Sequence, residues 1–392
     1  MRRRISGGRA FAGGAIAGDR RWCGRAGGVA SRTNGGWWHG SRAARRRGNL
    51  GAMLQQGRTR ASHRTDLITV LLGTWFSLGL FLDAWAHSNV PELETFFTPW
   101  HAVFYSGFAA TGAWILWLVW RNVQAGRRGL DAVPVGYGPA VLALPVFAVF
   151  GAGDYLWHTL IGIEQGIDIL FSPTHLGLIT SMIVILTTPL RTLWMDKDVT
   201  APSLRRFLPA ALALSFTTAL VLLFVSYADA TIYGSQGVLR AFSFDKADGG
   251  SSGANRLASS ITITNLVLIT PLLLAARRFR LPVGTATILQ VVVMLLSTAV
   301  ANYENLGTAA AFLLSGIVID VLLWWLRPSE ERLREYRAFA FAAPLVTWVF
   351  FFAAAGIGAG GMPSVTEMWT GAPLVAALHG LLLAIVLVPT RR

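Results

Sequence analysis

Two short stretches of this chain place aspartate and histidine at spacings that can form a metal site. The first is Asp83-x3-His87, followed after 13 residues by His101, and the second is Asp154-x3-His158, followed after 16 residues by His175. Residues four apart share one face of a helix, so each Asp-His pair can point at a single spot. Six carboxylate and imidazole donors suit copper, iron, zinc or manganese.

The two later histidines each close a Ser/Thr-Pro-x-His sequence, at residues 98–101 and 172–175. Serine or threonine before proline is typical of a helix start, so both histidines are expected in the first turn of a helix. If the two stretches converge, a dinuclear centre with a bridging carboxylate can form. If they do not, two mononuclear sites are expected.

The metal interpretation favours copper or iron, with zinc as a further option. Haem is less favoured, because an axial histidine does not need a carboxylate on the same helix face. Two other interpretations stay open for the same residues. They can form a relay for protons or substrate, or each aspartate can simply orient a neighbouring histidine as part of the structure.

The spacing Asp83-x3-His87-x13-His101 resembles the Asp-x3-His-x12-His motif in the C subunit of copper membrane monooxygenases, with a gap one residue longer. The resemblance covers about 19 of the 392 residues and does not extend to the second stretch, whose gap is 16 residues. In that family the motif supplies copper ligands within membrane helices, beside separate partner subunits. The resemblance implies that Asp83, His87 and His101 are metal ligands here.

Further ionisable residues are candidates for an accessory role. Four acids in the two connecting segments can recruit cations or belong to solvated loops. The four acids are Glu92, Glu94, Glu164 and Asp168. Glu304 is expected at the same membrane level as the Asp/His residues. Asp320 and His379 lie well inside apolar segments, where they can form a proton path or bond to a neighbouring helix.

The elements that must position these residues are membrane helices. The chain is 53% hydrophobic and 14% charged, which is typical of a polytopic membrane protein. About 20 apolar residues cross the hydrocarbon core, and ten segments meet that length. We therefore predict an all-α integral membrane protein with spans at 66–87, 101–120, 136–158, 173–194, 206–228, 258–276, 283–302, 307–326, 338–358 and 369–389.

Arginine and lysine gather in alternate connections, at residues 121–128, 191–206, 277–280 and 327–337. The positive-inside rule then predicts a multi-pass protein of the cell membrane with both termini cytoplasmic. Only the 229–257 connection departs from the trend, with three cations that Asp245 and Asp248 offset in part. The Asp/His residues are consequently expected at the extracytoplasmic ends of the first four helices.

The sequence divides into three parts. Residues 1–65 contain 15 arginines and one acid, which accounts for the formal net charge of +14. This Gly/Arg-rich tail is predicted to be disordered. It can be a cytoplasmic segment that binds anionic lipid headgroups, a targeting segment, or a stretch that is not translated because translation starts at Met53. Residues 66–196 form a duplicated unit of four helices with both motifs, and residues 197–392 form six further spans. Since the rest of the chain is neutral, no nucleic-acid partner is expected.

The leading functional hypothesis is a metal-dependent membrane protein that acts as an oxidoreductase or as a metal-handling factor. The alternative is a cation- or proton-coupled transporter or channel that uses the same Asp/His residues. Whether the protein is an enzyme, and which residue would be catalytic, stays open. The lipid bilayer is the expected partner, with a homo-oligomer or a membrane redox partner as further options. A polar path to Asp320 and His379 would indicate transport, and a closed pocket would indicate a cofactor site.

Overall fold

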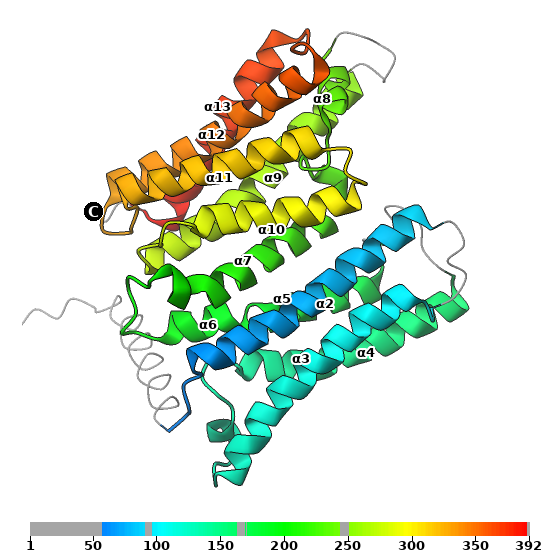
Figure 1. Cartoon of the computed structure of the whole chain (residues 1–392), viewed down its shortest axis with the longest axis vertical. Helices are drawn as coiled ribbons and strands as arrows, with labels where there is room; N and C mark the ends of the chain where they lie inside the picture. The colour runs from blue at the N-terminus through cyan, green and yellow to red at the C-terminus, as the bar shows by residue number, and fades with distance from the viewer. Residues whose placement is uncertain (1–56, 91–95, 163–168, 170, 244–250, 390–392) are drawn as a thin grey trace, which may run out of the picture. The chain divides into compact units, whose positions relative to one another are not determined.

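The computed structural model describes residues 57–90, 96–162, 169, 171–243 and 251–389 (Figure 1). The chain separates into two units, Met1–Met53 and Leu54–Arg392, and the first lies outside the described residues. Most of the predicted tail and the four acids Glu92, Glu94, Glu164 and Asp168 therefore also lie outside them. The fold below is that of the second unit.

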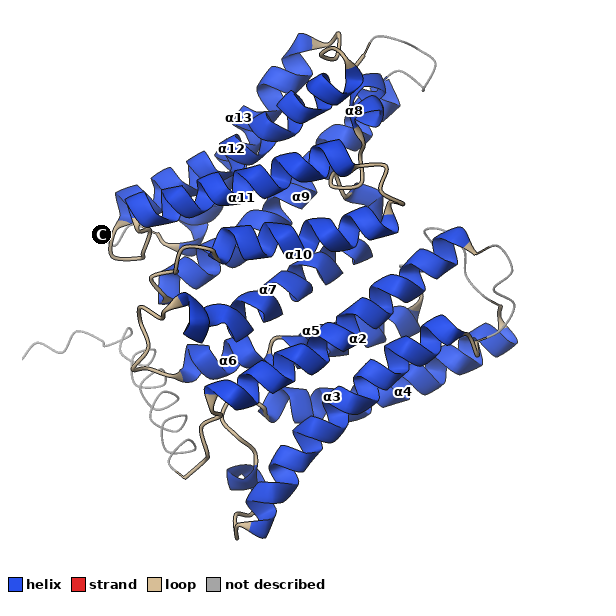
Figure 2. Ribbon diagram, viewed as in Figure 1, coloured by secondary structure: helices blue, strands red, loops and turns tan. Residues whose placement is uncertain are grey.

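The described part of this unit is built from helices and contains no β-strand, which confirms the all-α prediction (Figure 2). Two short 3-10 helices, η1 (Gly129–Ala132) and η3 (Ser226–Ala228), interrupt the loops. The α-helices are α2 (His63–Asn89), α3 (Pro99–Gln124), α4 (Gly138–Leu160), α5 (Pro173–Leu186), α6 (Thr188–Met195), α7 (Leu204–Phe224), α8 (Ser235–Ala241), α9 (Ser251–Arg278), α10 (Thr285–Val300), α11 (Leu306–Leu326), α12 (Leu333–Ala359) and α13 (Thr366–Leu387).

Eight of the described helices are long and apolar enough to cross a membrane, so the chain is a multi-pass membrane protein. A ninth crossing results if α5 and α6, which are bent by 41° at a short break, count as one span. Helix α10 has 16 residues and a length of about 24 Å, which is shorter than the roughly 30 Å hydrocarbon core. Each predicted segment thus coincides with a helix or with the bent pair, while the count of ten crossings stays a prediction.

Helices α2 and α3 pack with their backbones almost in contact (Figure 1). A methyl group on Gly79 would lie 2.6 Å from the Cα atom of Phe104, and one on Gly107 would lie 2.6 Å from the Cα atom of Phe76. Small residues at helix crossings allow this approach inside a membrane, where van der Waals packing holds helices together. The two glycines therefore set the distance and register between the end of α2 and the start of α3.

Helix α2 also packs against α7 and α10. Near its C-terminal end, Trp85 donates a hydrogen bond from Nε1 to Oδ1 of Asn302, at 2.8 Å. Asn302 and Tyr303 follow α10 with left-handed backbone angles, φ 51° and 65°, which turn the chain sharply after that helix. The C-terminal ends of α2 and α10 consequently lie next to each other.

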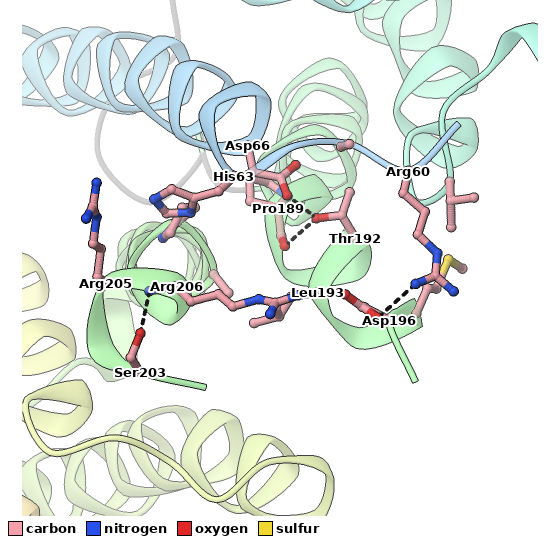
Figure 3. Close-up of a pocket in the computed structure, with 15 residues that line it drawn as sticks. Arg60, His63, Asp66, Pro189, Thr192, Leu193, Asp196, Ser203, Arg205 and Arg206 are labelled. Carbon is pink, nitrogen blue, oxygen red and sulfur yellow. Dashed lines mark hydrogen bonds and ion pairs between the residues drawn. The ribbon is translucent and has the colours of Figure 1, made fainter. Parts of the chain in front are cut away.

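A cavity of about 360 Å³ lies at the N-terminal end of α2, between α6 and the start of α7 (Figure 3). Its carboxylates have partners within the protein: Asp66 accepts hydrogen bonds from Thr192 and Tyr137, and Asp196 pairs with Arg60 and Arg206. Asp66 precedes Asp83 by 17 residues, or about 25 Å along the helix. This cavity is therefore separate from the Asp/His residues.

Candidate metal centre

The structure brings the six predicted ligands together at one end of the helices α2 to α5. Asp83 and Asp154 lie near the C-terminal ends of α2 and α4, each one turn before His87 or His158. His101 and His175 lie in the first turns of α3 and α5, as the sequence predicts. The C-terminal ends of α2 and α4 thus supply two donors each, and the starts of α3 and α5 supply one each.

Within each half, one carboxylate oxygen faces two histidines. Asp83 Oδ2 lies 3.9 Å from His87 Nε2 and 3.5 Å from His101 Nε2. Asp154 Oδ1 lies 3.7 Å from His158 Nε2 and 3.3 Å from His175 Nε2. The same contacts recur in both halves, although the common origin of the two halves as a duplication stays a prediction.

The two halves meet at His101. One group of donor atoms, all within 4.8 Å of one another, contains Asp83, His87 and His101, and a second contains His101, Asp154 and His158. The ring of His158 lies 6.0 Å from that of His101 and 6.4 Å from that of His87, measured between centroids. The six residues form one cluster, which we call the Asp/His cluster, and not two distant sites.

The Asp–His separations are compatible with a shared metal ion. All four exceed the 2.7–3.2 Å range of N–H···O bonds. Two donors that bind one metal ion at about 2.0–2.2 Å can be at most about 4.4 Å apart, and each of the four pairs meets this limit. A metal ion can therefore be held with small side-chain adjustments.

Charge points to the same conclusion. Asp83 and Asp154 are buried, with 8% and 1% of their surface exposed. Among the described residues, neither carboxylate forms an ion pair with arginine or lysine. Burying charge without a counter-ion is costly, and a divalent cation would balance both carboxylates at once.

Two hydroxyl groups hold the later histidines in place. Thr98 Oγ1 accepts a hydrogen bond from the His101 backbone N–H and lies 3.1 Å from its Nδ1 atom, and Ser172 Oγ does the same for His175, with 2.7 Å to Nδ1. Helix capping and ring orientation thus use the same oxygen. When Nδ1–H donates to that oxygen, Nε2 is left for a metal ion.

Replacing Ser172 with alanine is expected to weaken metal binding about 10- to 100-fold, because orienting partners of histidine ligands have effects of that size. The lost helix cap should also lower the stability by about 1 kcal/mol. Ser203→Ala is the matched control, since Ser203 caps α7 by accepting from the Arg206 N–H and has no histidine partner. Metal titration and thermal unfolding measure the two effects. Equal affinities in the two variants would refute an orienting role for Ser172.

Three residues of the site were not predicted. Thr174 Oγ1 donates a hydrogen bond to Asp154 Oδ1 at 3.0 Å, and Tyr105 OH donates to Asp154 Oδ2 at 3.4 Å. Phe96 stacks on the His101 ring with centroids 4.8 Å apart. Tyr105 follows His101 by four residues, so the sequence already places both on one face of α3. Nothing in the sequence position of Phe96 indicates that it lies beside His101.

The predicted accessory residues differ in their distance from the cluster. Glu304, after α10, lines the same cavity as Asp83, His87 and His175. Asp320 accepts hydrogen bonds from the backbone N–H groups of Ala286 and Thr287, so it caps α10 at its start, about 24 Å from the end that adjoins α2. His379 is partly buried in α13.

Ligands of the cluster line two cavities. A small one, of about 40 Å³, lies beside Asp83, His101 and Asp154 and is otherwise lined mainly by apolar residues of α2, α3, α5 and α7. A larger one, of about 500 Å³, lies beside His87 and His175. Neither is lined by Asp320 or His379. The cavities therefore do not join the cluster to these two residues.

Asp229 is a buried carboxyl that lines a small cavity together with Ser226 and Ile232, which also line the larger cavity. It accepts hydrogen bonds from the backbone and side chain of Thr231 and from Thr264. Burial raises its pKa to about 6, and these hydrogen bonds lower it in part. Its contacts give it a structural role in the turn after η3.

Comparisons with known proteins give no match to this chain, whether with protein-family models, curated proteins or solved structures.

Proposed function

We propose that this protein binds a transition metal ion in the Asp/His cluster, at the extracytoplasmic ends of its first four membrane helices. Copper or iron is favoured, because both take imidazole and carboxylate ligands, and zinc is the third option. The ligands are Asp83, His87 and His101 from one hairpin and Asp154, His158 and His175 from the other. The motif-level resemblance to copper membrane monooxygenases supports copper for the first three.

The observation that carries the proposal is the shared position of His101. Its ring belongs to donor groups of both halves, and the donor atoms of each group lie within 4.8 Å of one another. Histidines with no role other than ending or starting a helix would not need to lie beside two buried carboxylates. One ion, or two ions bridged by a carboxylate, fits this arrangement.

The proposed role is that of an oxidoreductase or a metal-handling factor. His87 and His175 line the 500 Å³ cavity, so a bound ion would be reachable by a second molecule. A catalytic metal site keeps such an open position, whereas a structural one is closed. The largely apolar surroundings of the smaller cavity favour a resident ion over a transported one, since a transport route needs polar groups along its length.

The test is elemental analysis of the purified full chain, with optical and paramagnetic spectra, beside the double variant His87→Ala, His158→Ala. We expect about one or two copper or iron ions per chain, and their loss from the double variant. His379→Ala is the control and should keep the metal. A parent chain that contains no metal after loading with Cu²⁺, Fe²⁺ or Zn²⁺ would refute the proposal, and a Soret band would replace it with haem binding.

A further inference from the structure

We infer that the 500 Å³ cavity beside the Asp/His cluster binds an amphipathic molecule with an apolar tail and a non-anionic, hydrogen-bonding head group, such as a lipophilic alcohol or amine. The inference extends the proposed function by naming a ligand class for the same site. The cavity itself does not depend on a bound metal, because its shape comes from the protein alone. Its volume falls within the roughly 300–1,000 Å³ of typical ligand pockets.

Three helix ends give the cavity an apolar part and a polar part. Along α2 the lining residues are Leu80, then Asp83 and Ala84, then His87 and Ser88. Since a helix rises about 1.5 Å per residue, Leu80 lies about 12 Å deeper than Ser88.

The other two helices repeat this order. Leu223 and Phe224 end α7 and precede Ser226 and Tyr227, while Val300 ends α10 and, with Ala301 after it, precedes Glu304. All three helices end at this cavity, so along each helix the apolar residues lie deeper in the membrane and the polar residues nearer its surface. Ile169 and Ile232, from connecting segments, add apolar lining outside the helices. A molecule with a tail and a head fits this gradient in one orientation.

Charge selects the head group. Asp83 and Glu304 line the cavity, and its described lining residues include no arginine or lysine. In the metal-free chain, a carboxylate or phosphate head would meet these acids without a counter-ion, at a cost that low dielectric increases. A hydroxyl or ammonium group can instead donate hydrogen bonds to Glu304 at the mouth and reach toward His87 and His175.

The experiment uses two photoreactive ten-carbon probes that carry a diazirine on the chain and end in a hydroxyl or in a carboxylate. Each labels the purified full chain, metal-free and metal-loaded, and labelled peptides are identified by mass spectrometry. In the metal-free chain we expect the alcohol to label peptides at the C-terminal ends of α2, α7 and α10 at least tenfold more than the carboxylate does, and a bound cation should narrow this difference. Glu304→Gln should raise labelling by the carboxylate probe and leave the alcohol labelling in place.

Ala84→Phe should fill the cavity and lower alcohol labelling about tenfold. Its control is Ala152→Phe, an exposed alanine of α4 that lines an aromatic cavity on another side of the cluster. Equal labelling of the metal-free chain by both probes, or label spread evenly over the outward helix faces, would overturn the inference even if the chain binds metal when loaded. Selective labelling of a chain that takes up no metal would uphold the inference while the proposed function fails.

Discussion

Replacing His101 with alanine is expected to lower metal affinity more than about 100-fold. His101 is the residue shared by the two donor groups, so its loss removes a ligand from both. Mutation of a residue that only orients a ligand already lowers metal affinity 10- to 100-fold, and loss of a ligand itself should lower it more. The imidazole is buried, with 6% of its surface exposed, so water cannot easily take its place. Competitive titration with a metal-binding dye measures the affinity.

His87→Ala is the comparison within the cluster. His87 belongs to one of the two groups and lines the open cavity, so water can substitute for its ring. We expect a smaller loss than for His101→Ala. If the two variants lose affinity equally, the two halves bind independently, and the shared position of His101 has no consequence for binding.

Replacing Gly107 with valine is expected to destabilise the protein by more than about 3 kcal/mol and to disrupt the metal site. The new Cβ would lie 2.6 Å from the Cα atom of Phe76 and 2.8 Å from its backbone nitrogen. Backbone atoms cannot move aside as a side chain can, so α3 must shift away from α2. Overpacking of a core costs 1–3 kcal/mol even where side chains can adjust. Because α2 carries Asp83 and α3 carries His101, the shift also separates these ligands.

Thermal unfolding in detergent and metal titration measure these two effects. Ala109→Val is the matched control, since Ala109 is exposed on the same helix two residues later. The control should unfold at the parental temperature and bind metal normally. A Gly107→Val protein that unfolds and binds metal like the control would contradict the close packing of α2 and α3.

Much of the fold was predictable because apolar length and helix-start residues are local signals. The ten apolar segments each coincide with a helix or with the bent pair α5–α6. The Thr98-Pro99 and Ser172-Pro173 pairs predicted the starts of α3 and α5 correctly. What local signals could not give was the bend between α5 and α6 or the shortness of α10, which depend on packing against neighbouring helices.

The sequence predicted which residues come together within each half of the candidate site, but not how the two halves contact each other. The i, i+4 spacing places Asp83 with His87 and Asp154 with His158 in any helix. That His101 also meets Asp154 and His158 depends on how the two hairpins pack, and no spacing in the sequence encodes it. Glu304 reaches the same cavity from a turn more than 200 residues after Asp83. Asp320 shows that a buried acid in an apolar segment need not belong to the site. The sequence made it a candidate for a proton path, and the structure shows that it caps the start of α10.

The most direct test of the metal centre is X-ray absorption at the metal edge of the purified, metal-loaded full chain. We predict a first shell of imidazole nitrogen and carboxylate oxygen at about 2.0–2.2 Å, with at least two histidines per ion. The outer-shell signal of imidazole should weaken in His101→Ala. A shell of oxygen alone, unchanged in that variant, would mean that the ion binds elsewhere and would contradict a metal site in the Asp/His cluster.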